Sequence, residues 1–292
     1  MKTDIFLGIN AENISKDLAK EFAGVGLIRS EYLCRNINEY ITTKSCQKYI
    51  ENYLINICNI FKDKEVWYRF TDLTGNEIAT LDGADDNVIE KWHFIGTKGV
   101  RRHLKYKETF EQECLAIKNV YAEHKNLGVI IPYIKDIEEY NEIRTIIREV
   151  GFEGKIGIMA EIPSVLLEIN DFIDAGVDNI TVGLNDLTSL LLGTYRESNY
   201  HDKKHLAVVK TVMYIQEICR NNKIPFSIAG YLKEEEINFY KNLGVDRITV
   251  NYINLPQLNK KFDSLPELGL LLKIKENTRK RREIVENEKG VK

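Results

Sequence analysis

The chain has 292 residues, a formal net charge of −3 and 43% hydrophobic residues. This length suits one large α/β barrel or two ordinary domains. The balanced charge argues against nucleic acid as the main partner, and no segment reaches the ~20 apolar residues that cross a bilayer. The five scattered cysteines lack CxxC spacing, so we expect free thiols in a reducing cytoplasm.

Short apolar runs alternate with longer amphipathic segments along the chain. The expected strands are Ile5–Asn10, Gly26–Arg29, Val66–Thr71, Gly128–Tyr133, Lys155–Glu161, Asn179–Asn185, Pro225–Gly230 and Arg247–Asn251. The expected helices are Ser15–Phe22, Thr43–Phe61, Phe110–Glu123, Ile137–Val150, Ser164–Ala175, His205–Asn221, Glu234–Leu243 and Pro266–Val285. Eight strand–helix alternations predict a (β/α)8 TIM barrel, and a doubly wound open sheet is the competing fold.

The domain organisation follows from the same pattern. We expect one barrel domain over residues 1–272 and a charged C-terminal helix or tail over residues 273–292, which frays into solvent. The long polar stretch Thr71–Lys107 is interpreted as an extended loop between the third strand and the next helix, lying over the barrel mouth.

Polar residues fall at the carboxyl ends of the expected strands, where barrel enzymes build their active sites. Glu161 ends one strand and Asp186 ends the next, so the two carboxylates are expected to converge. Oxygen ligands of this kind suit Mg²⁺. Arg29 and Arg69 lie at the ends of two other strands, and arginine binds carboxylate or phosphate through two hydrogen bonds.

Each candidate also has a structural interpretation. Arg29 and Arg69 could form ion pairs at the mouth, Asn185 could cap a helix, Gly183 could be a turn residue, and Arg196 could lie at the mouth or on the surface. The histidines show no metal-ligand spacing and are interpreted as surface or loop residues: they are His93, His103, His124, His201 and His205.

Several motifs together resemble one enzyme family. They are Gly24-Val-Gly-Leu-Ile-Arg-Ser-Glu31, Tyr68-Arg-Phe-Thr-Asp72, Glu161-Ile-Pro-Ser164 and Gly183-Leu-Asn-Asp-Leu-Thr188. The chain is similar, over roughly residues 3–255, to the C-terminal phosphoenolpyruvate/pyruvate-binding barrel of the phosphoenolpyruvate-utilising enzymes. That family includes phosphoenolpyruvate synthase, which looks closest, pyruvate phosphate dikinase and enzyme I of the sugar phosphotransferase system.

The resemblance implies roles for individual residues. Glu161 and Asp186 would bind Mg²⁺, Arg29 and Arg69 would hold the transferred phosphoryl group, and Asn185 would contact the substrate. The other positions expected at the substrate site are Gly183, Leu184, Ala229, Gly230 and Tyr231. In the family a histidine on a mobile domain carries the phosphoryl group, so a carrier would act in trans here. A homodimer is implied by the resemblance alone.

The chain departs from the family pattern at positions that matter for catalysis. Lys98 stands where the family has an arginine, which removes the bidentate fork. Ala229 stands where a cysteine protonates the enolate carbon, Leu184 replaces a small hydroxyl residue, and Tyr195 replaces an acidic one. Three functions therefore stay open: an Mg²⁺-dependent enzyme acting on phosphoenolpyruvate, pyruvate or a related 2-oxo acid; a C–C lyase or aldolase; and an impaired binding or regulatory module.

Overall fold

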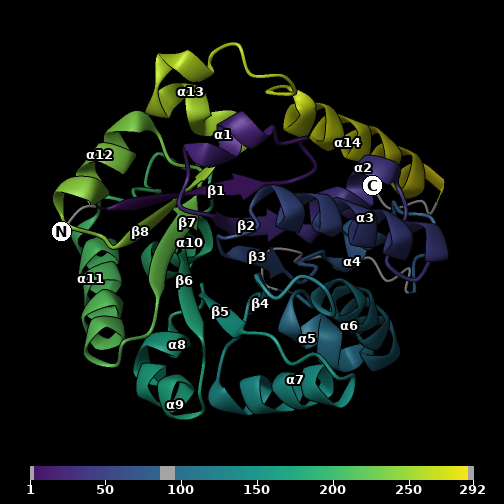
Figure 1. Cartoon of the computed structure of the whole chain (residues 1–292), viewed down its shortest axis with the longest axis horizontal. Coiled ribbons are helices and arrows are strands. Elements are labelled where there is room, and N and C mark those ends of the chain that lie inside the picture. The colour runs from purple at the N-terminus through teal and green to yellow at the C-terminus, as the bar shows by residue number, and fades with distance from the viewer. Residues whose placement is uncertain (1–2, 86–95, 289–292) are drawn as a thin grey trace.

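The computed structural model describes residues 3–85 and 96–288. In this part of the chain, eight parallel strands close into a barrel in sequence order, and the last strand pairs with the first (Figure 1). The strands are β1 (Asp4–Ile9), β2 (Val25–Arg29), β3 (Val66–Arg69), β4 (Leu127–Ile131), β5 (Ile156–Ala160), β6 (Asn179–Gly183), β7 (Phe226–Gly230) and β8 (Arg247–Asn251). The predicted TIM barrel is confirmed, and the open sheet is not formed.

Helices surround the strands on all sides in Figure 1. They are α1 (Lys16–Lys20), α2 (Ser30–Ile37), α3 (Lys44–Ile60), α4 (Gly75–Ile78), α5 (Val100–Lys105), α6 (Lys107–Tyr121), α7 (Ile137–Glu149), α8 (Ser164–Leu167), α9 (Ile169–Asp174), α10 (Leu184–Leu192), α11 (Leu206–Asn221), α12 (Glu234–Asn242), α13 (Leu255–Leu258) and α14 (Leu270–Glu288). The Ser15 hydroxyl accepts a hydrogen bond from the Leu18 amide, as a helix cap should.

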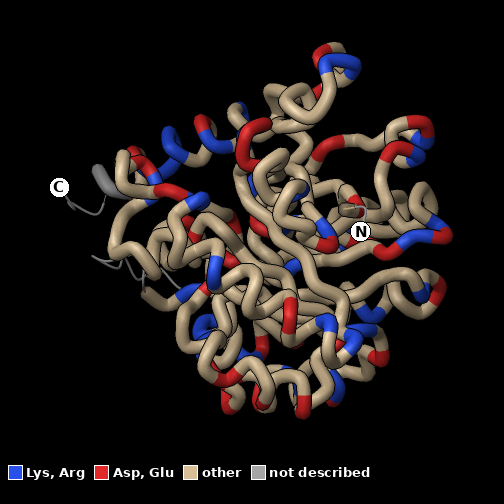
Figure 2. Tube along the Cα trace, turned by 90° about the vertical axis from the view of Figure 1, so that its left-hand side faces the viewer, with Lys and Arg blue, Asp and Glu red and all other residues tan. Residues whose placement is uncertain are grey.

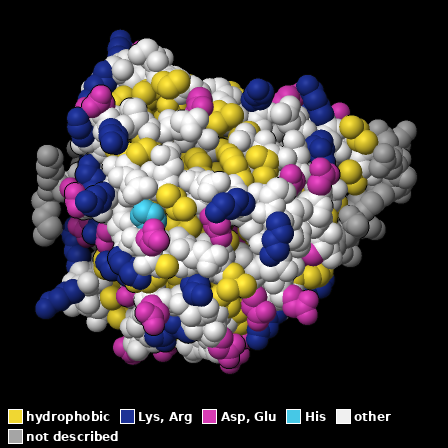
Figure 3. Space-filling view, turned by 45° about the vertical axis from the view of Figure 1, so that its right-hand side comes forward, with side chains coloured by type: hydrophobic (Ala, Val, Ile, Leu, Met, Phe, Trp, Pro, Cys, Tyr) yellow, Lys and Arg dark blue, Asp and Glu magenta, His cyan; other side chains and the backbone are white. Residues whose placement is uncertain are grey.

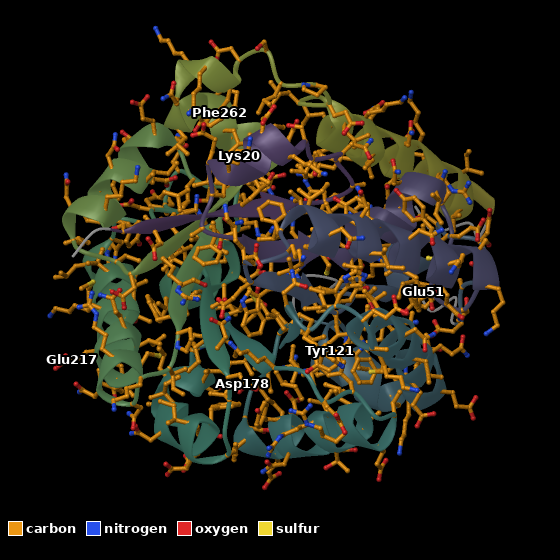
Figure 4. All side chains as sticks on the ribbon, viewed as in Figure 1. Lys20, Glu51, Tyr121, Asp178, Glu217 and Phe262 are labelled. Atoms are coloured by element: carbon orange, nitrogen blue, oxygen red, sulfur yellow. The ribbon has the colours of Figure 1, made fainter. Side chains whose placement is uncertain are left out.

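The core has two parts because a barrel strand buries both of its faces. The larger cluster lies mainly between the strands and the helices, and a smaller one combines Leu27, Trp67, Ile130, Met159 and Ala229 from five strands. Figure 4 labels residues of the outer layer, where Tyr121 packs on Phe152 at a ring-centroid distance of 4.9 Å. Residues of both charge signs are spread along the trace in Figure 2, and their side chains are spread over the face shown in Figure 3.

Several expected element boundaries were wrong. The expected strand Asn179–Asn185 ends at Gly183, and α10 starts at once, so Asn185 and Asp186 lie in the first turn of a helix. The expected helix Ser164–Ala175 is interrupted at Glu168, whose carboxylate accepts a hydrogen bond from the Ile137 amide. This long-range contact coincides with the interruption, and nothing in the local sequence signals it.

The C-terminal helix α14 lies beside α2 (Figure 1) and is fastened to the barrel. Arg35 Nε donates to Thr278 Oγ1 over 2.9 Å, and Arg281 Nε donates to the Thr80 carbonyl over 2.6 Å. Pro266, expected in the first turn, lies before the helix, and its carbonyl accepts a hydrogen bond from the Tyr252 hydroxyl. The segment expected to fray is therefore helical and docked in its described part, and residue 272 falls inside α14.

Within residues 3–85 and 96–288, no helix combines the length and the apolar character needed to cross a membrane. The stretch between β3 and α6 is not a plain loop, because it contains α4 and α5. Thr74 and Glu77 form a capping box at the start of α4. Residues 86–95, which include His93, lie outside the described residues.

The surface interpretation of the histidines was wrong for His103. Its side chain is only 4% exposed, and its ring lies 4.5 Å from the Phe110 ring centroid. Burial, together with the neighbouring Arg102 charge, lowers the pKa of His103 to about 3. The imidazole is therefore neutral in the folded protein at every pH where the barrel is expected to work.

This burial predicts that acid weakens the fold. Because the folded pKa lies below the ordinary value near 6.5, the stabilisation is present above pH 6.5 and is lost as pH falls towards 3. When the pH falls from 7.5 to 5, His103 becomes protonated in the unfolded chain but not in the folded protein. This should lower the free energy of unfolding by roughly 2 kcal/mol, at about 1.4 kcal/mol per pH unit below 6.5. Urea unfolding at both pH values should show this loss in the wild type and a smaller loss in His103→Phe. Equal losses would contradict the prediction.

Candidate functional site

A cavity of about 180 Å³ opens at the carboxyl ends of the barrel strands. Of the residues expected at a substrate site, all except Leu184 line it, and Leu184 is fully buried in the core. Among the residues that the structure describes, five cationic and five acidic side chains line the wall: Arg29, Arg35, Arg69, Lys98, Arg196, Glu31, Asp72, Glu77, Glu161 and Asp186. The charges of these side chains therefore sum to zero. A bound metal cation would give the cavity a net positive charge, which an anion could neutralise.

Three carboxylates converge at the centre of this cavity. Asp72, Glu161 and Asp186 each place one oxygen within 4.8 Å of the others. Glu161 follows β5, Asp186 lies in the first turn of α10, and Asp72 follows β3 by three residues. The sequence led us to expect Glu161 and Asp186 together but missed Asp72. The sequence feature that could have indicated Asp72 is its position three residues after Arg69 in the motif Tyr68-Arg-Phe-Thr-Asp72.

The environment of these carboxylates suits a divalent cation. Burial raises the pKa of Glu161 to about 8, and the nearby Asp186 and Asp72 charges add to the effect. Glu161 Oε2 accepts a hydrogen bond from the Tyr133 amide at 3.1 Å. Within the described residues, Asp72 Oδ1 is buried without a hydrogen-bond partner. Hard cations take oxygen ligands of this kind, so the residues present fit Mg²⁺.

Arg69 and Lys98 hold the carboxylates together. Arg69 Nη2 lies 2.5 Å from Glu31 Oε1, and Arg69 Nη1 lies 3.6 Å from oxygens of Asp72 and Glu161. Lys98 Nζ lies 3.4 Å from Asp72 Oδ2 and 3.9 Å from Asp186 Oδ2. Both side chains are therefore part of an ion-pair network inside the cavity wall. This agrees with the ion-pair interpretation of Arg69, and its role in holding a substrate anion stays a prediction.

Arg29 has a different environment. Its Nε donates to Asn10 Oδ1 at 2.7 Å, and its guanidinium lies 4.5 Å from the Tyr32 ring centroid. In the described part of the chain, Arg29 has no ion-pair partner and its buried Nη2 has no hydrogen-bond partner. A guanidinium that lines a cavity in this state can bind an incoming anion without first breaking a salt bridge.

The connection between α10 and α11 brings a third group of residues to the site. Arg196 Nη2 lies 2.5 Å from Asp186 Oδ1, so Arg196 is a mouth residue. His201 Nε2 lies 3.0 Å from the Asn185 carbonyl oxygen, and Lys203 Nζ donates to the Tyr231 carbonyl at 2.6 Å. The sequence could not assign Arg196, because the path of a long connection depends on contacts that local patterns do not encode.

Gly183 is required for space. A Cβ built at this residue would lie 2.5 Å from both Cγ and Oε1 of Glu161. Its backbone φ is −82°, so the turn interpretation is not what demands glycine here. The absence of a side chain allows the Glu161 carboxylate to sit directly beside the strand that leads to Asp186.

Comparison with known proteins gives three findings. The family model for the PEP-binding domain of PEP-utilising enzymes matches residues 1–265. Phosphoenolpyruvate synthase of Pyrococcus furiosus is 30% identical over 246 residues, which cover 78% of this chain and 30% of the relative. The synthase of Aeropyrum pernix is 27% identical over 302 residues, which cover 94% and 37%. The chain thus spans about a third of the length of these curated relatives.

Among solved structures, RipC from Yersinia pestis is similar with a TM-score of 0.50 and 10% identity, and the match covers 90% of this chain and 94% of RipC. At this identity the likeness shows the fold alone. The sequence comparisons, by contrast, include the cavity-lining motifs, since the matched range contains Arg29, Arg69, Glu161 and Asp186.

Proposed function

The chain belongs to the family of the PEP-binding domain of PEP-utilising enzymes, and on this premise we propose that it binds phosphoenolpyruvate, pyruvate or a related 2-oxo acid together with Mg²⁺. The observation that carries the proposal is that one cavity holds the cluster of Asp72, Glu161 and Asp186 and the guanidinium of Arg29, which has no ion-pair partner in the described part of the chain. One feature suits a metal and the other suits an anion, and both line the same cavity.

We assign the metal to Glu161 and Asp186. Mg²⁺ is usually held by one or two protein carboxylates and keeps other positions for water or substrate. When bound, Mg²⁺ would act as a Lewis acid that stabilises negative charge on the carboxylate and enolate oxygens. Asp72 forms ion pairs with Arg69 and with Lys98, and its negative charge offsets part of their positive charge.

The cations of the wall would bind the substrate anion. Arg29 is open to an oxyanion, and Arg196 reaches the cavity from the α10–α11 connection. A divalent ion added to five cations and five carboxylates leaves two positive charges in excess. This excess favours a small polyanion such as phosphoenolpyruvate over a neutral ligand. Asn185 lines the same wall and would orient the substrate by hydrogen bonding.

We propose phosphoryl transfer as the reaction class, in the half-reaction that links phosphoenolpyruvate and pyruvate. In the described residues, no histidine lines the cavity, so a phosphohistidine carrier would have to come from another chain or domain. Arg29, Arg69 and Lys98 would hold the moving phosphoryl group by charge and position, which are the main contributions proteins make to this reaction. A homodimer and a cytoplasmic location are further proposals, which light scattering and fractionation test.

One observation favours a second candidate. Ala229 lines the cavity beside Leu27 and Met159, so this part of the wall carries no proton donor. An enolate formed here without being protonated could attack a carbonyl group, which is lyase or aldolase chemistry. Release of pyruvate from oxaloacetate or from 4-hydroxy-2-oxo acids would favour this candidate. Ligand binding with no turnover under any donor would favour a regulatory module.

Calorimetric titration with oxalate, an enolpyruvate mimic, tests the proposed function. We expect oxalate to bind with Mg²⁺ and to lose at least about 100-fold in affinity without it, because carboxylates and oxalate repel each other unless a cation lies between them. Glu65→Gln, a change in a residue that pairs with Arg247 outside the cavity, should bind as the wild type does. Binding that ignores Mg²⁺, or no binding at all, would overturn the proposal.

A further inference from the structure

Interconversion of enolpyruvate and pyruvate moves one proton to or from C3, so a group in the cavity must carry that proton. β7 supplies only Ala229 at the apolar part of the wall, and a methyl group cannot exchange a proton. The proton carrier therefore has to come from another part of the cavity wall. This argument rests on the proposed function, because it takes the 2-oxo acid or its enol as the substrate.

Most proton-bearing groups of the wall already have another role. Lys98 is held between Asp72 and Asp186. Glu31 is paired with Arg69, and arginine does not give up its proton in proteins. The hydroxyl of Thr249 is buried and, among the described residues, has no hydrogen-bond partner. A hydroxyl without an adjacent base is a poor proton carrier.

Glu77 is also occupied, since its carboxylate accepts hydrogen bonds from the amide and hydroxyl of Thr74 in the capping box of α4. With Glu161 and Asp186 assigned to the metal, the remaining side chains with a suitable O–H in the described wall are two tyrosines. Tyr32 meets Arg29 and Arg35 at its ring, with guanidinium carbons 4.5 Å and 5.0 Å from the ring centroid. In Tyr231, a lysine contacts the hydroxyl oxygen, which is the atom that would exchange the proton, so Tyr231 is the better candidate.

Tyr231 directly follows β7 and lines the cavity two residues after Ala229. Lys275 Nζ donates to Tyr231 Oη at 3.3 Å, and the Arg29 guanidinium carbon lies 5.5 Å from the ring centroid. The phenol therefore lies near one cation of the substrate site and one cation of α14. Lys275 contacts the oxygen that would carry the negative charge after the phenol has given up its proton.

We propose that Tyr231 is the acid–base residue that exchanges the C3 proton, with Lys275 of the C-terminal helix positioning its hydroxyl. In the forward direction, the Tyr231 O–H bond breaks and a C3–H bond forms from the enolate double-bond electrons, which leaves pyruvate and a phenolate. The negative charge moves from the enolate to the phenolate oxygen, which Lys275 contacts. Water at the mouth returns the proton. The reverse sequence removes a proton from pyruvate.

Lys275 lies on a helix that is hydrogen-bonded to the barrel. The matched family domain ends at residue 265, and Lys275 lies beyond it on α14. That helix is held by the Arg35–Thr278 and Arg281–Thr80 hydrogen bonds, which place Lys275 beside Tyr231 (α14 beside α2 in Figure 1). The helix thus connects a residue outside the matched domain to the wall of the substrate site.

Hydrogen–deuterium exchange of the pyruvate methyl group tests this role. The full chain is incubated with pyruvate and Mg²⁺ in D₂O, and the methyl signal is followed by proton NMR. Tyr231→Phe should slow exchange by about 100-fold or more, the usual contribution of a positioned acid–base group. Its Mg²⁺-dependent oxalate affinity should stay within about threefold, since oxalate needs no proton. Tyr200→Phe, a change at an 83% exposed tyrosine, is the matched control.

Lys275 is tested separately as a positioning residue. Lys275→Met should slow exchange by about tenfold, and Lys275→Arg should restore most of the rate, because a cation is what the phenolate needs. Wild-type rates in Tyr231→Phe, or no exchange by a wild type that binds oxalate with Mg²⁺, would overturn this inference and leave the proposed binding of a 2-oxo acid with Mg²⁺ standing. Failure of oxalate binding in the wild type would overturn the proposed function itself.

Discussion

Replacing Glu161 with glutamine should abolish Mg²⁺-dependent binding of oxalate by this chain. One of the Glu161 oxygens lies within 4.8 Å of oxygens of Asp72 and Asp186, and the carboxylate contacts Arg69 and the Tyr133 amide. Glutamine keeps the size and one acceptor oxygen, so Tyr133 keeps its partner, but it removes one of the two proposed charged ligands. Loss of a neighbour that only supports a ligand costs 10–100-fold in affinity, so loss of a ligand should cost more than about 100-fold.

Calorimetry with oxalate and Mg²⁺ measures this loss directly, and circular dichroism shows whether the variant is folded. Glu65→Gln is the matched control, because Glu65 lies at the start of β3 and pairs with Arg247 and Lys155 outside the cavity. We expect the control to bind within about twofold of the wild type, since exposed ion pairs have small effects. If Glu161→Gln bound oxalate with wild-type affinity in Mg²⁺, Glu161 would not be a metal ligand.

Replacing Arg69 with methionine should lower the free energy of unfolding by about 3–5 kcal/mol, which is the usual cost of removing one partner of a buried ion pair. Arg69 is 7% exposed and lies within 3.6 Å of oxygens from Glu31, Asp72 and Glu161. Methionine fills a similar volume but leaves these carboxylates to repel one another. The expected fall in the melting temperature is about 5–8 °C for a chain of this size.

Urea unfolding at neutral pH measures the effect, and Arg247→Met serves as the matched control. Arg247 pairs with Glu65 over 2.8 Å, with side chains 26% and 30% exposed. Such a solvated pair contributes about 0–1 kcal/mol. Similar losses in the two variants would show that the Arg69 network is no more important than a surface ion pair. Arg69→Lys keeps one charge without the fork, so it should lie between the wild type and Arg69→Met.

Whether the protein exchanges the C3 proton of pyruvate distinguishes between the functions proposed for it. If Tyr231 carries the C3 proton, the chain can complete the interconversion of enolpyruvate and pyruvate in spite of Ala229. If the proton is not exchanged while oxalate still binds with Mg²⁺, the enolate has no acid in the cavity. Carbonyl addition by a pyruvate enolate also needs a proton removed from C3, so ligand binding without turnover then becomes the better explanation. The methyl exchange experiment therefore also distinguishes an enzyme that forms the enolate from a binding module.

The sequence by itself determined the barrel and the position of its site. Parallel strands that bury both faces must be apolar along their length, and this makes eight short runs such as Ile156–Ala160 visible in the sequence. Their carboxyl ends meet at one edge, so Glu161 and Asp186 could be placed together without coordinates. Helix caps such as Ser15 are also local, because the bond spans three residues.

Only the tertiary structure decided the partners in the site. Asp72 joins the acidic cluster, Arg196 reaches Asp186, and Lys275 reaches Tyr231, each across a connection whose path is set by distant contacts. His103 looked polar in sequence but is enclosed by aromatic rings that other segments supply. Periodicity reports which face of an element is buried, whereas the distance between two loops depends on how all the elements pack. The fold and the edge that carries Glu161 and Asp186 were therefore readable from the chain, and the contact between Tyr231 and Lys275 was not.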